Sequence, residues 1–199
     1  MVDDRGQALS FEGIAAGIIL LSAVGFALQV TAVTPLSPST SSQHVQNQIQ
    51  STSEGALDSA AERDVLADSV LYWNDSTGTF HSAGPDVEHY QGVPSGDLAI
   101  SDTLNRTFAD RNVAYNLRIR YHTAEGLETQ QFVEQGRPSD HAVTASQTLV
   151  LHESDRLVLA NGSEGARLGD PGTGFYAPNL DTDESLYNIL HVEVVAWRI

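Results

Sequence analysis

The chain has 199 residues and a formal net charge of −16, from 26 Asp and Glu against 10 Lys and Arg. A chain of this length has room for one domain, with or without an anchor. The acidic balance argues against binding to nucleic acid, which requires basic clusters for its phosphates. The absence of Cys excludes disulfides, thiolate metal sites and cysteine nucleophiles.

All ten basic residues are Arg, and the sequence contains no Lys. In concentrated salt, the repulsion among carboxylates is screened over a very short distance, so an acidic surface costs little. The composition therefore resembles that of proteins from salt-loving archaea. An ordinary acidic exported domain is the alternative interpretation.

An uncharged run of 22 residues lies near the N-terminus, from Gly13 to Thr34. As a helix rising about 1.5 Å per residue, the run would span roughly 33 Å, and a bilayer core is about 30 Å thick. Glu12 and Pro35 bound the run. We therefore expect a transmembrane helix over residues 7–34.

A cleaved secretory signal is the first alternative to an anchor. Such a signal begins with a positively charged region, whereas residues 1–12 contain three acidic residues and a single basic one, Arg5. The candidate cleavage triplet, Val30-Thr31-Ala32, is a poor match to the usual small-residue pattern.

The segment RGQALSFE before the uncharged run resembles the class III signal peptide of archaeal type IV pilin-like proteins, which a prepilin peptidase cuts after Gly. The resemblance implies a leader over residues 1–6, ending at Gly6, and a mature N-terminus at Gln7. Pilins usually carry Glu at the fifth mature position, whereas here Phe11 is fifth and Glu12 is sixth. In a filament, the Glu12 carboxylate would pair with a neighbour's N-terminal amine, because an unpaired carboxylate is costly in lipid. Alternatively, Glu12 lies among the lipid headgroups and marks the end of the helix.

The resemblance continues along the chain. The run TAVTPLSPSTSSQH, the small-residue helix ending in LYWNDSTGTFH and the closing segment SLYNILHVEVVAWRI resemble a haloarchaeal family of pilin-like membrane proteins without an established activity. This resemblance implies a location rather than a mechanism. It predicts a single-pass protein of the cell membrane with an extracytoplasmic C-terminal domain.

The Pro- and Ser-rich residues 35–43 are typical of a short solvated connector. They precede the expected outer domain, residues 44–199. Apolar and small residues recurring on one face predict a helix over residues 44–72 and a shorter one over 98–110. Loops rich in Gly, Asp or Pro are expected over residues 74–96 and 161–184.

The hydrophobic period changes at Val113. From Val113 to Tyr121 apolar and polar residues alternate, which predicts a strand with one buried face. The closing segment, residues 187–197, is apolar on both faces, which is typical of a central strand. Further strands are expected over residues 127–134 and 143–152, and residues 156–160 are expected to continue the latter after a turn at 153–155. The predicted fold is α+β, a pilin-like outer domain with helices packed on an antiparallel sheet of about four strands.

Three triplets match the N-glycosylation signal and begin at Asn74, Asn105 and Asn161. They matter only if the outer domain faces the exterior. Asn74 and Asn161 fall in expected loops. Asn105 falls in an expected helix, where a transferase would reach it less easily.

The sequence contains no recognised metal or catalytic motif. His81 and His89 share a loop with Asp86 and Glu88, but without the spacing of a known metal site. Residues 181–185, DTDES, alternate oxygen ligands as in part of a calcium loop, yet they lack its Gly and distal Glu. An acidic surface loop is the alternative. We expect no catalytic residues, metal or cofactor, although a Ser/His/Asp triad could assemble from dispersed residues.

Two functions remain in view. The first is a non-enzymatic pilin-like or minor pseudopilin subunit, whose partners are the membrane, other pilin-like subunits and a prepilin peptidase. The second is a permanently tethered extracellular binding or sensory module that supports another surface machine. The N-terminus of the mature chain distinguishes the two.

Overall fold

The computed structural model describes residues 4–32, 37–84, 87–94, 98–180 and 185–199, and within helices it leaves out the side chains of residues 4–10, 28–32 and 37–42. The chain divides into two compact units, Met1–Gln43 and His44–Ile199. We call the second unit the head.

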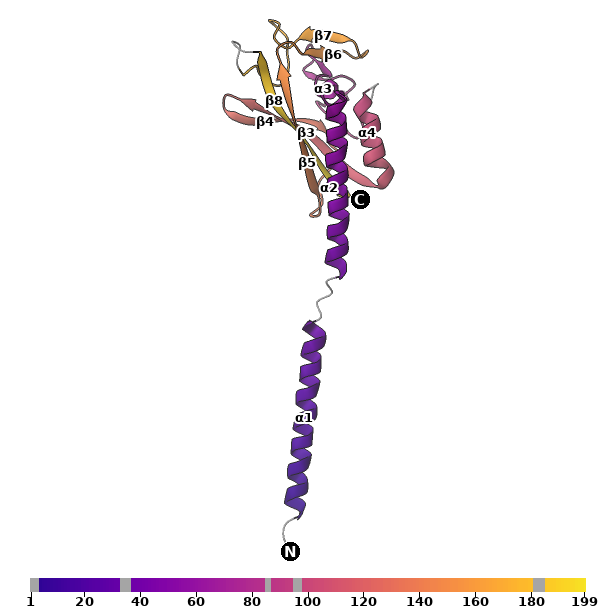
Figure 1. Cartoon of the computed structure of the whole chain (residues 1–199), viewed down its shortest axis with the longest axis vertical. Coiled ribbons are helices and arrows are strands. Elements are labelled where there is room, and N and C mark those ends of the chain that lie inside the picture. Colours follow the sequence, from indigo (N-terminus) through magenta and orange to yellow (C-terminus); the bar gives the residue numbers. More distant parts are fainter. Residues whose placement is uncertain (1–3, 33–36, 85–86, 95–97, 181–184) are drawn as a thin grey trace. The chain divides into compact units, whose positions relative to one another are not determined.

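Helix α1, Asp4–Ala32, dominates the first unit (Figure 1). Among the described residues, no helix combines the length and the apolar character needed to cross a membrane. The transmembrane helix expected over residues 7–34 is therefore not found. Its described stretch, residues 11–27, is 17 residues long and includes one acidic residue. The side chains of residues 7–10 and 28–34 lie outside the described part.

Helix α2, Ser37–Glu62, takes the place of most of the expected connector, whose first two residues lie outside the described chain. Pro38 lies in the first turn, where its missing N–H costs no intrahelical hydrogen bond. The helix expected to continue to residue 72 is broken instead at Asp64, which has a left-handed backbone with φ 60°. The short helix α3, Val65–Val70, follows this break.

The head is built on a four-stranded antiparallel sheet with the order β4-β3-β8-β5 (Figure 1). This arrangement confirms the predicted α+β fold with four antiparallel strands. The prediction of a central closing strand is also confirmed, because β8 pairs with both β3 and β5. The strands are β3 Val113–Thr123, β4 Gly126–Val133, β5 Val143–His152 and β8 Leu186–Arg198.

One face of this sheet is buried beneath helices. Helix α4, Ala99–Thr107, continues into a 3-10 turn, η1, Ala109–Arg111. Leu57 of α2, Leu104 of α4 and Val194 of β8 line a single small interior void, so both helices pack on the face that carries Val194. On β3 this face carries the residues that the alternation predicted to be buried: Val113, Tyr115, Leu117, Ile119 and Tyr121.

The head also contains two small hairpins that the sequence did not predict. One joins β1, Trp73–Asn74, to β2, Thr79–Phe80. The other joins β6, Arg156–Val158, to β7, Glu164–Arg167. The turn expected at residues 153–155 is present, since the backbone N–H of Asp155 donates to the carbonyl of His152 over 3.0 Å. The prediction that residues 156–160 continue the third strand is wrong, because β6 pairs with β7 in a separate sheet.

Candidate functional site

Most of the exposed large apolar side chains among the described residues belong to α1. Phe11 is 76% exposed and Leu21 is 75% exposed. Burying one such side chain stabilises a protein by about 1.5–3 kcal/mol, and contiguous exposed apolar surface marks a contact with protein or lipid. The side chains that share this exposure are Phe11, Ile14, Ile18, Ile19, Leu20, Leu21, Val24 and Phe26.

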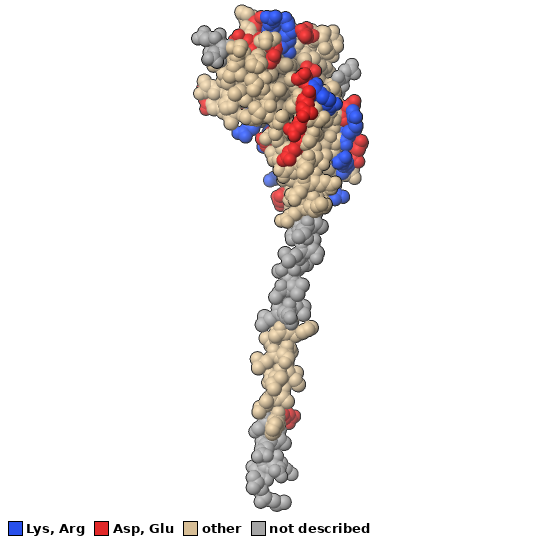
Figure 2. Space-filling model, in the orientation of Figure 1, with Lys and Arg blue, Asp and Glu red and all other residues tan. Residues whose placement is uncertain are grey.

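Charge is nearly absent from the described surface of α1. Residues 11–27 include one charged residue, an acidic one. In Figure 2 this stretch is almost wholly tan, whereas acidic and basic groups gather on the head. That acidic residue is Glu12, which is exposed beside Phe11. The proposed leader junction, Gly6 and Gln7, belongs to the helical backbone of α1, and its side chains lie outside the described part.

The three candidate glycosylation sites lie on different elements of the head. Asn74 ends strand β1 rather than lying in a loop; it is half-buried, and its side-chain oxygen accepts the backbone N–H of Ser76 at 3.0 Å. Asn161 is exposed in the β6–β7 turn, where the backbone N–H and the hydroxyl of Ser163 donate to it at 3.0 and 2.7 Å. Asn105 is exposed on α4, the helix in which it is expected.

The structure separates the two histidines considered for a metal site. His81 Nε2 is buried and has no hydrogen-bond partner among the residues that the structure describes, whereas His89 Nε2 lies 3.3 Å from a carboxylate oxygen of Glu134. No group of three His, Asp or Glu among the described residues could hold a metal ion. Asp86 and residues 181–184 of the calcium-loop candidate lie outside the described residues.

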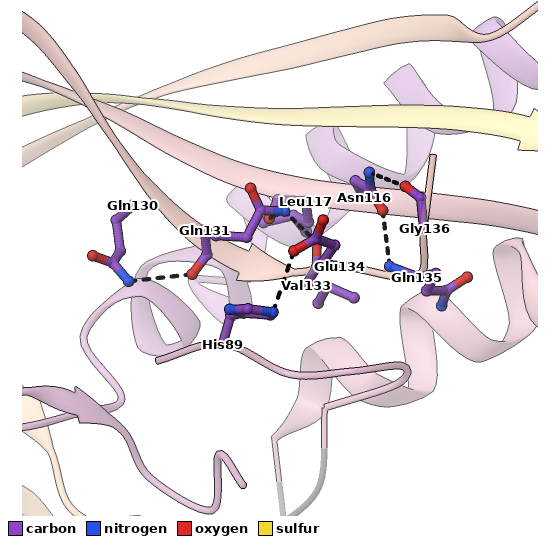
Figure 3. A network of polar contacts seen from close by, with 9 residues as sticks. All are labelled: His89, Asn116, Leu117, Gln130, Gln131, Val133, Glu134, Gln135 and Gly136. Atoms are coloured by element: carbon purple, nitrogen blue, oxygen red, sulfur yellow. Dashed lines mark hydrogen bonds and ion pairs between the residues drawn. The ribbon is translucent and has the colours of Figure 1, made fainter. Parts of the chain in front are cut away.

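His89 belongs to a polar network at the end of β4 (Figure 3). Asn116 of β3 holds the network together: its Oδ1 accepts the backbone N–H of Gln135 and its Nδ2 donates to the carbonyl of Gly136, both over 2.8 Å. These bonds fasten the start of the β4–β5 connection to β3. The open hollow beside them, about 430 Å³, is lined partly by Glu134. The arrangement positions the chain, and the sequence carries no periodic signal for it.

A better enclosed cavity of about 210 Å³ lies where α2, η1 and the ends of β3 and β8 meet. Asn112 turns the chain from η1 into β3 with a left-handed backbone, φ 55°, which Asn tolerates better than most residues. The β3–β8 register places Arg198 opposite Val113. The cavity is lined by four apolar side chains, three uncharged polar ones and two arginines: Val45, Ile49, Phe108, Val113, Gln48, Thr52, Thr107, Arg111 and Arg198.

A family model matches residues 5–196 and is described as a family of unknown function, DUF7288. The chain belongs to the DUF7288 family. No curated protein and no solved structure matches it. The match spans both α1 and the head, so the family pattern includes both units. The family description assigns neither a pilin nor a haloarchaeal character to DUF7288, and both remain inferences from the sequence.

We expect His81 to make the stability of the head depend on pH. Its ring packs edge-on against Tyr72 at 4.9 Å between centroids, and burial lowers the pKa of His81 although Asp75 acts in the opposite direction. The unfolded chain therefore binds this proton more readily than the folded chain. The free energy of unfolding should be highest above the ordinary pKa of about 6.5 and should fall as the pH drops through and below that value.

We expect His81→Phe, which keeps a ring against Tyr72 but cannot ionise, to flatten this fall between about pH 7 and pH 5. Urea unfolding of the full chain in detergent, followed by circular dichroism at each pH, measures the difference from wild type. His141→Phe, at an exposed histidine, is the matched control. Identical pH profiles for wild type and His81→Phe would contradict the assignment.

Proposed function

We propose that this DUF7288 protein is a non-enzymatic, membrane-anchored surface protein of the pilin-like class. Residues 1–6 are the leader, Gln7 is the mature N-terminus, residues 7–34 are the anchor and the head lies outside the membrane. The single observation that supports this proposal most is the exposed apolar surface of α1, because most of the exposed large apolar side chains of the described residues lie on this one helix.

The anchor extends beyond the described stretch of α1. Residues 11–27 supply the exposed apolar side chains, and the uncharged sequence continues to Thr34. In lipid or in a bundle of like helices, each of these side chains leaves water, which favours insertion or assembly. The small residues Gly13 and Gly17 have open space around their Cα atoms, so another helix backbone could approach closely there.

Glu12 is the charged group at the start of this apolar surface. A carboxylate in lipid is stable only when it is paired or reaches the headgroups. In a pilin-like assembly, the amine of a neighbour's Gln7 would pair with Glu12. Glu12→Gln removes the charge while keeping the size, so it should weaken assembly without preventing membrane insertion.

The second candidate function is a permanently tethered binding module. It shares the anchor and the head but keeps residues 1–6. The Arg-lined cavity of the head is the feature that would serve this function: a ligand bound there other than a second copy of the chain would favour the tethered module.

The test is the N-terminus of the full chain produced in a host that has a prepilin peptidase. We expect mass spectrometry to find a chain that begins at Gln7, and Gly6→Val to abolish this cleavage, because the peptidase cuts after Gly. Gly13→Val makes the same change inside the apolar run and should leave cleavage intact. An intact Met1 in the wild-type chain would favour the tethered module, and unchanged processing of Gly6→Val would contradict the leader.

A further inference from the structure

The cavity where α2, η1 and the ends of β3 and β8 meet carries positive charge, which is unusual in so acidic a protein. Arg111 and Arg198 are both exposed at the cavity, and neither guanidinium has an ion pair among the residues that the structure describes. The chain has 26 acidic residues against these and eight other arginines. Two unpaired cations beside a buried apolar wall, which includes Phe108 and Val113, favour an occupant that is apolar with acidic neighbours.

The turn between β3 and β4 has the complementary chemistry. Leu127 is 47% exposed there, and Glu125 and Glu128 on either side of Gly126 and Leu127 are exposed as well. Gly126 has φ +137°, a conformation that L side chains rarely adopt, so the turn is closed by a glycine. The Tyr121 hydroxyl donates to Glu128 Oε2 over 3.0 Å, which holds that carboxylate on the face of Tyr121, while Leu127, paired with His122, points to the other face.

The turn and the cavity lie at opposite ends of β3. Val113, at the first residue of the strand, lines the cavity, and Thr123, its last residue, leads into the turn. The ten steps from Val113 to Thr123, at about 3.3 Å each, separate them by roughly 33 Å along a strand that is paired on both sides. The turn therefore cannot enter the cavity of its own chain, whereas it can enter that of another copy.

We propose that the Leu127 turn of one head docks into the Arg111–Arg198 cavity of a second copy. The leucine side chain leaves water against the apolar wall, and Glu125 of the same turn faces the two arginines. The cavity volume of about 210 Å³ equals several waters at about 30 Å³ each, which is enough for one leucine side chain. A contact between different surfaces of identical chains is heterologous, so it forms a ring or an open row of heads.

Charge explains why this contact can form between two chains that repel each other overall. At physiological ionic strength, charges farther apart than about 8 Å are largely screened, which weakens the repulsion between the net charges of −16. The close pairs between the turn and the cavity are screened less. The contact does not depend on α1, so it stands or falls separately from the proposed leader and anchor.

Cysteine crosslinking tests this contact on a clean background, because the chain has no Cys of its own. Leu127→Cys places a thiol on the turn, and Thr107→Cys places one at the cavity. Full-length single variants carrying tags of different size are mixed in detergent and treated with a short bis-maleimide. We expect the mixed dimer to exceed the Leu127→Cys homodimer, and the double variant to give a ladder of higher species.

Val150→Cys paired with Thr107→Cys is the matched control, since Val150 is 45% exposed on another strand of the same head. Arg111→Glu should reduce the mixed dimer about tenfold or more, and Glu125→Arg on the partner copy should restore it. Circular dichroism of each variant verifies folding. Equal crosslinking through Val150, the absence of a mixed dimer, or an Arg111→Glu variant that crosslinks like its parent would each overturn the proposal.

Discussion

Phe80→Ala should lower the free energy of unfolding of the head by about 3–5 kcal/mol, the usual cost of deleting a fully buried aromatic ring. Phe80 is 1% exposed and lies at the centre of an aromatic cluster. Its ring centroid lies 5.0 Å from Trp73, 4.8 Å from Phe132, 6.1 Å from Tyr90 and 5.8 Å from Tyr176. The cluster joins β2 to the end of β4, so its loss loosens two parts of the head at once.

Urea unfolding of the full chain in detergent measures this effect. Circular dichroism is the signal in place of tryptophan fluorescence, because Trp73 contacts the substituted ring and its fluorescence would change with the substitution itself. Phe11→Ala makes the same chemical change on α1, where the ring is 76% exposed, and should leave the unfolding of the head unchanged. A loss below about 1 kcal/mol for Phe80→Ala would mean that neighbouring side chains fill the cavity left by the ring, and that the stability of the cluster does not depend on Phe80.

Periodicity in the sequence was enough to place the main sheet. The alternation from Val113 to Tyr121 identified both β3 and its buried face, because a strand repeats every two residues and one side of this strand meets the helices. The closing segment is apolar on both sides and is indeed the strand between β3 and β5. Long, strongly patterned elements therefore followed from local rules.

Short elements and long-range pairings did not follow from the sequence. Strands of two to four residues, such as β1, β2 and β7, contain too few positions to display a period. The helix break at Asp64 depends on one left-handed residue, which no nearby Gly or Pro announces. The cavity needs η1, β3 and the last residues of β8 together, and only the register of the folded sheet brings Arg111 and Arg198 to one place.

The ion pair between Arg118 and Glu193 is another such pairing, and it carries the second large expected effect. The two residues are 75 positions apart and lie opposite each other on β3 and β8. Glu193 is 9% exposed although it is charged, while the Arg118 side chain is 43% exposed. A carboxylate at this depth is stable because the guanidinium compensates for its lost water.

Arg118→Met should therefore lower the free energy of unfolding by about 2–4 kcal/mol, somewhat below the 3–5 kcal/mol of a fully buried pair because the arginine is partly in water. Arg106→Met removes a guanidinium whose ion pair with Asp102 is exposed on both sides, 74% and 77%, and should cost no more than about 0.5 kcal/mol. Both variants make the same change of side chain, so the difference between their losses in free energy of unfolding reports the effect of burying the ion pair.

The double variant Arg118→Met with Glu193→Leu completes the argument. Replacing both partners removes the uncompensated charge and puts apolar side chains side by side, so much of the stability lost in Arg118→Met should return. Urea unfolding of the wild type, the two single variants and the double variant gives the coupling energy, expected to be about 1–3 kcal/mol. Losses that simply add would show that Glu193 does not depend on Arg118, and that its low exposure costs the head little.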